Sequence, residues 1–230
     1  MPTTNAKKRP DNHRPMLYVL FRKYGLNGAI RIIRQDIGFD IRNRTNTAIP
    51  VNRARLFRSN QNEQNRYVAS TFGVLDAVID FASTEMDLTQ SGFLDLGSGK
   101  GKALIAASRY PFSSIRGIEV SKLMHRTATR NIARLQLESD IELVNDCAAN
   151  IQIKSHERLI YFFNSFTGSI LERCLESIQQ AHRNDSGLFV YVNPTEHDQV
   201  QRYFPLIQKV FVQPGNCEVN YYALPVNTAY

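Results

Sequence analysis

The residues best suited to hold a ligand are two acids and the glycine-rich loop between them. Asp95 lies in the apolar run 93–96, and Glu119 follows a second apolar run, 114–118. The loop has glycine at every second position: Gly97, Gly99 and Gly101. Glycine has no Cβ, so this backbone can approach a ligand closely. An acid after the next strand accepts hydrogen bonds from two ribose hydroxyls. The pattern predicts a βαβ unit that binds a nucleoside.

The spacing of the glycines argues against a dinucleotide. A dinucleotide site needs Gly-x-Gly-x-x-Gly, in which the helix N-terminus faces a pyrophosphate. Here the loop reads Gly-x-Gly-x-Gly, and Asp95 stands two residues before the first glycine. A carboxylate at that position repels a pyrophosphate and suits a ligand that carries an ammonium group and a sulfonium. The alternative is an ordinary Rossmann turn without such a ligand.

The segment 95–101, Asp-Leu-Gly-Ser-Gly-Lys-Gly, resembles the first motif of class I S-adenosylmethionine (SAM)-dependent methyltransferases. The resemblance implies an α/β fold with a doubly wound, mostly parallel seven-stranded sheet and an antiparallel C-terminal strand. It also implies SAM as the cofactor and methyl transfer as the reaction. We expect the cofactor to contact Asp95, Gly97, Ser98, Gly99, Gly101, Glu119 and Val120.

The predicted third strand ends at Asp146 and Cys147, where the resembling enzymes often carry an acid. The resemblance implies that Asp146 accepts a hydrogen bond from the adenine amine, with Cys147 beside it. The alternative is that Asp146 caps the segment that follows.

The fourth predicted strand ends in Asn164-Ser165-Phe166, which is similar to the Asn-Pro-Phe segment of small, mostly bacterial methyltransferases. Enzymes that methylate base amino groups typically carry prolines after this Asp or Asn, so Ser165 argues against an N6-adenine or N4-cytosine acceptor. Asn164 is our candidate to position the nucleophile through its side-chain oxygen. It alternatively ends the strand with an Asx-turn.

Tyr67 is the second candidate carried over from the resemblance. In the resembling small enzymes a tyrosine in this region closes over the methionine part of SAM, where an aromatic face attracts a sulfonium. The alternative is that Tyr67 packs in the core. In-line methyl transfer needs mainly alignment and loss of a proton, so we assign no general base.

The acceptor is a weaker inference. Looser similarity to non-SET protein lysine methyltransferases implies a lysine-type amine of a protein. Alternatives are an RNA methyltransferase guided by the basic N-terminal segment, a small-molecule methyltransferase, and a non-catalytic SAM-fold scaffold.

Apolar periodicity predicts the elements that position these residues. A bent helix or two short helices cover 16–35, with Gly25 and Gly28 as interruptions, followed by a loop at 36–50 and a polar connector at 59–65. Further helices are expected at 66–81, 122–137, 170–182 and 200–204. Strands are expected at 93–96, 114–118, 141–144, 159–163, 188–192, 209–212 and 219–224. The last two strands are joined by a short link, so they should pair antiparallel.

Positive charge is concentrated in the N-terminal part of the 230 residues, which have 43% hydrophobic and 21% charged side chains. Residues 1–60 hold 13 of the 28 Lys and Arg but only Asp11, Asp36 and Asp40 of the 21 acids. We therefore divide the chain into a basic N-terminal helical extension, 1–60, and a methyltransferase domain, 61–230. Such an extension steers nucleic acid, an acidic protein or an anionic membrane surface toward the site, or only aids solubility.

Cysteine and histidine usage suggests no metal site. The three cysteines have no CxxC spacing, and the five histidines show no HxxxH or HExxH pattern. The apolar runs are far shorter than the ~20 residues of a membrane span, and no signal peptide is evident. We expect a cytoplasmic protein; the oligomeric state is not predicted.

Overall fold

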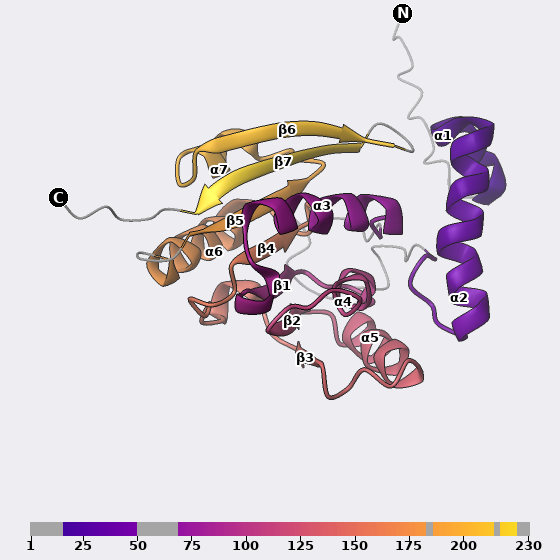
Figure 1. The fold of residues 1–230 in the computed structure, drawn as a ribbon, viewed down its shortest axis with the longest axis horizontal. Helices are drawn as coiled ribbons and strands as arrows, with labels where there is room; N and C mark the ends of the chain where they lie inside the picture. The colour runs from indigo at the N-terminus through magenta and orange to yellow at the C-terminus, as the bar shows by residue number, and fades with distance from the viewer. Residues whose placement is uncertain (1–15, 50–68, 183–185, 214–216, 225–230) are drawn as a thin grey trace, which may run out of the picture.

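The computed structural model describes residues 16–49, 69–182, 186–213 and 217–224. Its centre is a seven-stranded sheet with the strand order β3-β2-β1-β4-β5-β7-β6 (Figure 1). The strands are β1 (Gly92–Leu96), β2 (Ser114–Ile118), β3 (Ile141–Val144), β4 (Leu159–Phe162), β5 (Gly187–Val192), β6 (Leu206–Val212) and β7 (Cys217–Leu224). The first five pair in parallel, whereas β7 pairs antiparallel with both β5 and β6. The predicted fold class and the antiparallel terminal pair are confirmed.

Helices cover both faces of the sheet, as parallel strands require. They are α3 (Phe72–Glu85), α4 (Lys102–Ala107), α5 (Lys122–Arg134), α6 (Gly168–Ala181) and α7 (His197–Gln201), with short 3-10 turns η3 (Leu88–Gln90) and η4 (Ala148–Asn150). One apolar cluster joins α3, α4 and α5 to the sheet, and a second joins α6 and α7 to the other face. None of the helices in the described part of the chain is both long and apolar enough to cross a bilayer.

Alternation along β1 decides which face each side chain enters. Leu94 and Leu96 belong to the cluster under α6, whereas Phe93 belongs to the cluster under α3 and α4. Asp95 lies two residues after Phe93 and therefore shares its face. The acid before the glycine loop is thus held inside the α3 and α4 layer.

The N-terminal helices stand at the side of this layered domain (Figure 1). Helix α1 (Met16–Ile32) is kinked at Gly25, which has φ 66° and ψ 179°, as the bent-helix prediction implied. Residues 36–43 were predicted to be a loop, and this is wrong. They form the end of a π-helix, η1 (Ile33–Ile37), and helix α2 (Gly38–Asn43). Apolar periodicity could not predict η1 and α2, because the side chains that they bury are those of Asp36 and Asp40.

The observed ends of three helices differ from the predicted ones. The helix predicted at 66–81 is observed as α3, which starts at Phe72 because the Thr71 hydroxyl accepts a hydrogen bond from Val74 N, at 3.4 Å. Helix α5 ends at Arg134 rather than 137, and α7 starts at His197 rather than 200. Residues 66–68 and the polar connector 59–65 lie outside the described residues.

Candidate cofactor site at the carboxyl edge of the sheet

The glycine loop links β1 to α4 in a backbone conformation that needs glycine. Gly97 and Gly99 have φ 89° and 55°, in the left-handed region. Gly97 N and Ser98 N both donate to Ile118 O, at 2.9 and 2.8 Å, which holds the loop against the end of β2. A Cβ at Gly97 would overlap the Ser165 side chain from the end of β4. The loop therefore sits between β2 and β4 at the carboxyl edge, where the sequence predicts the ligand site.

Glu119 lies directly after β2 with its carboxylate turned back to this loop. Its Oε2 accepts from Gly99 N at 2.9 Å, and its Oε1 accepts from Ser121 N at 2.7 Å. Burial raises the pKa of Glu119 to about 7, although the two backbone N–H groups act in the opposite direction. The predicted ribose acid is thus placed on the glycine loop.

Asp95 is the second buried acid of the site. Burial raises the pKa of Asp95 well above its ordinary value, and the nearby charge of Glu119 raises it further. Within the described residues, no hydrogen bond or ion pair reaches the Asp95 carboxylate. A cation bound here would stabilise the ionised form of Asp95. The buried hydroxyls of Ser98 and Ser121 likewise have no partner among these residues.

The end of β3 lies beside Glu119. Asn145 Nδ2 donates to Glu119 O at 2.7 Å. Asp146 Oδ1 accepts from Cys147 N at 2.6 Å and from Asn150 Nδ2 at 3.1 Å, so the Asp146 carboxylate lies against the η4 turn. The N-cap of η4 is Cys147 and has no side-chain capping bond, so these contacts are not a helix cap by Asp146, and the adenine contact of Asp146 and Cys147 stays a prediction. Val120 is 41% exposed beside Glu119.

Asn164 lies at the end of β4, as predicted, but its side-chain oxygen is engaged. Asn164 has φ 42°, and its Oδ1 accepts from the Tyr191 hydroxyl at 3.0 Å and from Thr195 Oγ1 at 2.8 Å. These bonds tie the end of β4 to the end of β5. The oxygen expected to position a nucleophile therefore already has two donors, and that role stays a prediction. Tyr67 lies outside the described residues.

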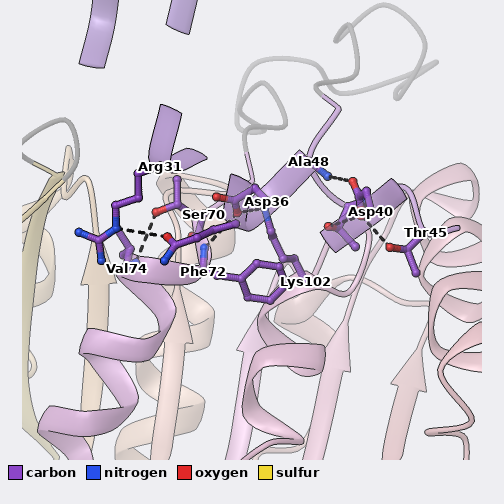
Figure 2. Close-up of polar contacts among 12 residues, drawn as sticks. Arg31, Asp36, Asp40, Thr45, Ala48, Ser70, Phe72, Val74 and Lys102 are labelled. Atoms are coloured by element: carbon purple, nitrogen blue, oxygen red, sulfur yellow. Dashed lines mark hydrogen bonds and ion pairs between the residues drawn. The ribbon is translucent and has the colours of Figure 1, made fainter. Parts of the chain in front are cut away.

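A buried ion pair that the sequence analysis missed joins the N-terminal helices to the start of α4. Lys102 Nζ pairs with Asp36 Oδ1, which also accepts from Phe72 N at 3.0 Å (Figure 2). Both side chains are buried, and the Lys102 ammonium lies 5.0 Å from the centre of the Phe72 ring. One carboxylate thus connects η1, α3 and α4.

Lys100, inside the glycine loop, makes a second connection. Its Nζ donates to Asn46 Oδ1 at 2.8 Å and to Ile49 O at 2.7 Å. The same turn is held from α5, because Asn131 Oδ1 accepts from Asn46 N at 3.0 Å and Asn131 Nδ2 donates to Lys100 O at 3.0 Å. Burial lowers the pKa of Lys100 to about 8. The signal in the sequence was the alternation Gly99-Lys100-Gly101-Lys102, which places two lysines where the backbone is buried.

The turn contacted by Lys100 is organised by Asp40. The Asp40 carboxylate accepts from the hydroxyls of Thr45 and Thr47 and from the backbone N–H of Thr47 and Ala48, at 2.7–3.0 Å (Figure 2). These bonds lower the pKa of Asp40 despite its burial. Residues 45–49 are therefore held against the glycine loop.

Comparison with known proteins supports the fold. No protein-family sequence model and no curated protein sequence matches the chain. Among solved structures, an RNA methyltransferase from Salinibacter ruber in complex with S-adenosyl-L-homocysteine (SAH) superposes with a TM-score of 0.51 at 16% identity, over 66% of this chain and 90% of that one. The chain has the methyltransferase fold.

Two further methyltransferases share that fold. A putative methyltransferase from Escherichia coli gives a TM-score of 0.54 at 18% identity, over 67% of this chain and 87% of that one. The ribosomal protein L11 methylase from Lactobacillus delbrueckii gives 0.51 at 16% identity, over 65% and 77%. Among these similar structures, one is named as an RNA methyltransferase and another as a methylase of a ribosomal protein. The shared fold therefore does not identify the acceptor.

Proposed function

We propose that this chain is a SAM-dependent methyltransferase. The observation that carries the proposal is the buried pair Asp95 and Glu119 beside a left-handed glycine loop. In this assignment Asp95 binds the ammonium of the methionine part, and Glu119 accepts from the ribose hydroxyls. A carboxylate has about four acceptor positions, so Glu119 can bind ribose while holding Gly99 and Ser121. The similar enzyme solved with SAH supports the same cofactor.

The site residues act by binding and alignment. When bound, SAM supplies a methyl carbon that is activated by the adjacent sulfonium. The acceptor lone pair forms the new bond as the carbon–sulfur bond breaks, and the acceptor proton leaves to solvent or to the acceptor's surroundings. Asp95 and the glycine loop hold the methyl donor, and the carboxyl ends of β4 and β5 border the space from which an acceptor approaches.

For the acceptor we propose a lysine-type amine of a protein, as the sequence resemblance implies. Such an amine becomes nucleophilic when desolvation lowers its pKa, so it requires no dedicated base. RNA is the second candidate, and it is favoured by a specific observation, the exposed basic face of α5. A small-molecule acceptor and a non-catalytic scaffold are the remaining alternatives, and no feature of the described residues favours either.

Two measurements test these proposals. Calorimetry should show binding of SAM and SAH but not of NAD, and the reverse result would overturn the cofactor assignment. Incubation of the protein and radiolabelled SAM with cell lysate should then label a macromolecule. Label that is removed by protease supports the protein acceptor, whereas label that is removed by ribonuclease supports RNA. The Asp95→Asn variant is the control for labelling by other enzymes in the lysate.

A further inference from the structure

Helix α5 carries a regular row of positive charge on its exposed side. Its basic residues recur every four positions, and all of them are exposed: Lys122, Arg126, Arg130 and Arg134. With a rise of about 1.5 Å per residue, neighbouring charges are about 6 Å apart along one side of the helix. The helix contains no Asp or Glu. We call these residues the α5 stripe.

Folding explains the α5 stripe only at Arg134, whose guanidinium donates to Arg44 O. The residues that α5 buries are Met124, Ala128, Asn131 and Ile132, on its other side. None of the ion pairs between described residues involves a stripe residue. Like charges at i and i+4 destabilise a helix, and Lys122 in the first turn opposes the helix dipole, whereas only Arg134 in the last turn is favoured by it. A stripe that weakens its own helix points to a bound polyanion.

The positive surface continues onto α2. An Nη1 group of Arg134 donates to Arg44 O, and Asn131 contacts Asn46, so the end of α2 lies beside α5. Arg42 and Arg44 are exposed there. Figure 1 shows these two helices on the same side of the molecule. The basic area is therefore broader than one helix.

The stripe begins at the candidate cofactor site. Lys122 opens α5, directly after Ser121, whose N–H donates to the Glu119 carboxylate. From there the row continues for about 18 Å, the rise of 12 helical residues, on the outer side of a helix whose inner side packs against the glycine loop through Ala128 and Asn131. A linear polyanion lying on α5 would have one end beside the cofactor.

We propose that the α5 stripe, with Arg42 and Arg44, binds the phosphodiester backbone of a nucleic acid; this inference goes beyond the proposed function and does not depend on the acceptor proposed there. Guanidinium groups bind phosphate oxygens in pairs, and arginine makes up most of this surface. The repeating phosphates match repeating cations, and the absence of Phe, Tyr and Trp from α5 fits backbone binding rather than base stacking.

Other polyanions fit this surface less well. A helix that binds a membrane surface inserts an apolar face, whereas the apolar face of α5 is packed on the sheet. Leu123, at 49% exposure, is the one large apolar side chain that α5 exposes. A specific protein interface needs an apolar centre, which a single leucine does not provide.

The test measures binding of fluorescein-labelled RNA and DNA 30-mers to the full chain by fluorescence anisotropy, from 50 to 300 mM NaCl. The stripe variant is Arg126→Gln with Arg130→Gln. The control variant is Arg173→Gln with Arg202→Gln, which removes the same charge from exposed positions on α6 and directly after α7. The two oligonucleotides tell which kind of backbone is preferred.

We expect salt-dependent binding that the stripe variant weakens about tenfold or more, while the control variant stays within about twofold. The slope of log K against log salt should fall by about two in the stripe variant alone, because each phosphate contact contributes about 0.9. Equal losses in both variants, or no salt-dependent binding, would overturn the proposal. It would also be overturned if the stripe variant lost binding to phosphatidylserine vesicles but kept its binding to both oligonucleotides.

SAH calorimetry on all three proteins separates this proposal from the proposed function. Equal SAH affinities show that the variants are folded and the cofactor site is intact. If no protein binds SAH but the α5 stripe binds nucleic acid as expected, the cofactor assignment fails and the stripe assignment stands.

Discussion

At the scale of single residues, Asp95 and Glu119 reduce the stability of the ligand-free fold. Both are buried, both have raised pKa values, and no lysine or arginine of the described residues pairs with either. Buried carboxyl groups without a compensating cation lower the stability of a fold at neutral pH. Their presence is explained if the ligand brings an ammonium group to Asp95 and hydroxyl donors to Glu119.

The first prediction concerns Glu119→Gln. The change keeps the side-chain shape but removes the charge, so SAH affinity should fall by about 10- to 100-fold, since hydrogen bonds to charged groups contribute about 1.5–3 kcal/mol. The free energy of unfolding of the ligand-free protein should change less, because removal of a buried charge offsets the loss of one of the two backbone N–H bonds that Glu119 accepts. Calorimetry and urea unfolding measure the two quantities. Glu142→Gln, at an exposed position on β3, is the control; an unchanged SAH affinity for Glu119→Gln would remove Glu119 from the site.

The second prediction concerns pH. The pKa of Glu119 is raised from 4.5 to about 7 in the folded protein, so the folded state binds more protons than the unfolded state between these values. Stability of the ligand-free protein should therefore fall as pH rises from about 4.5 to 7, and Asp95 acts in the same direction. SAH affinity should rise over the upper part of this window, as Glu119 ionises.

Thermal unfolding with and without SAH between pH 5.5 and 8 measures both trends. In the Glu119→Gln variant both trends should be weaker, and the difference from the unmodified protein is the contribution of Glu119. An SAH-induced shift in Tm that does not change with pH would contradict this account of Glu119.

At the scale of elements, η1, α2 and the 45–49 turn are bound to the cofactor loop by Lys102 and Lys100. The third prediction is that Lys102→Met destabilises the protein by about 3–5 kcal/mol, because it leaves Asp36 as a buried, unpaired charge. Urea unfolding measures the loss. The double variant Asp36→Leu with Lys102→Met should be less destabilised than the single variant. If the double variant is the less stable of the two, the ion pair itself stabilises the fold.

The fourth prediction is that Lys100→Met weakens SAH binding more than it weakens the fold. Lys100 connects the glycine loop to Asn46 and Ile49, so its loss should loosen the loop while the sheet remains intact. SAH calorimetry and urea unfolding are compared, and Lys100→Arg should restore part of the affinity. A Lys100→Met variant that binds SAH normally would show that the 45–49 turn does not support the loop.

The sequence predicts elements well where apolar periodicity decides them. All seven strands, the kink at Gly25 and the glycine loop follow from local patterns, because side chains that alternate or glycines with positive φ leave a local signal. Helix α2 and the Asp36–Lys102 pair left no such signal, since buried acids define them and their partners are distant in sequence. The two hydrogen bonds to Asn164 also left no local signal, because their donors, Tyr191 and Thr195, are distant from Asn164 in sequence.

At the scale of the whole molecule, positive charge occurs in two groups, the α5 stripe and the N-terminal segment 1–15. The α5 stripe begins beside Glu119, whereas the basic residues of 1–15 lie outside the described part of the chain. A contacting charge acts mainly on the dissociation rate, whereas a distant one acts through its long-range field on the association rate. The two groups of cations should therefore have different kinetic effects on the same partner.

The fifth prediction is that deletion of residues 1–15 lowers the association rate of a labelled nucleic acid, while the Arg126→Gln and Arg130→Gln variant mainly raises the dissociation rate. The deletion removes Lys7, Lys8, Arg9 and Arg14 against the single acid Asp11. Its effect should be large at low salt and vanish near physiological salt, where charges are screened over ~8 Å. SAH affinity should stay unchanged, because the glycine loop and the two acids form that site. Stopped-flow fluorescence at two ionic strengths separates the rates. If the deletion leaves the association rate at low salt unchanged, the segment serves solubility, and steering belongs to the folded surface alone.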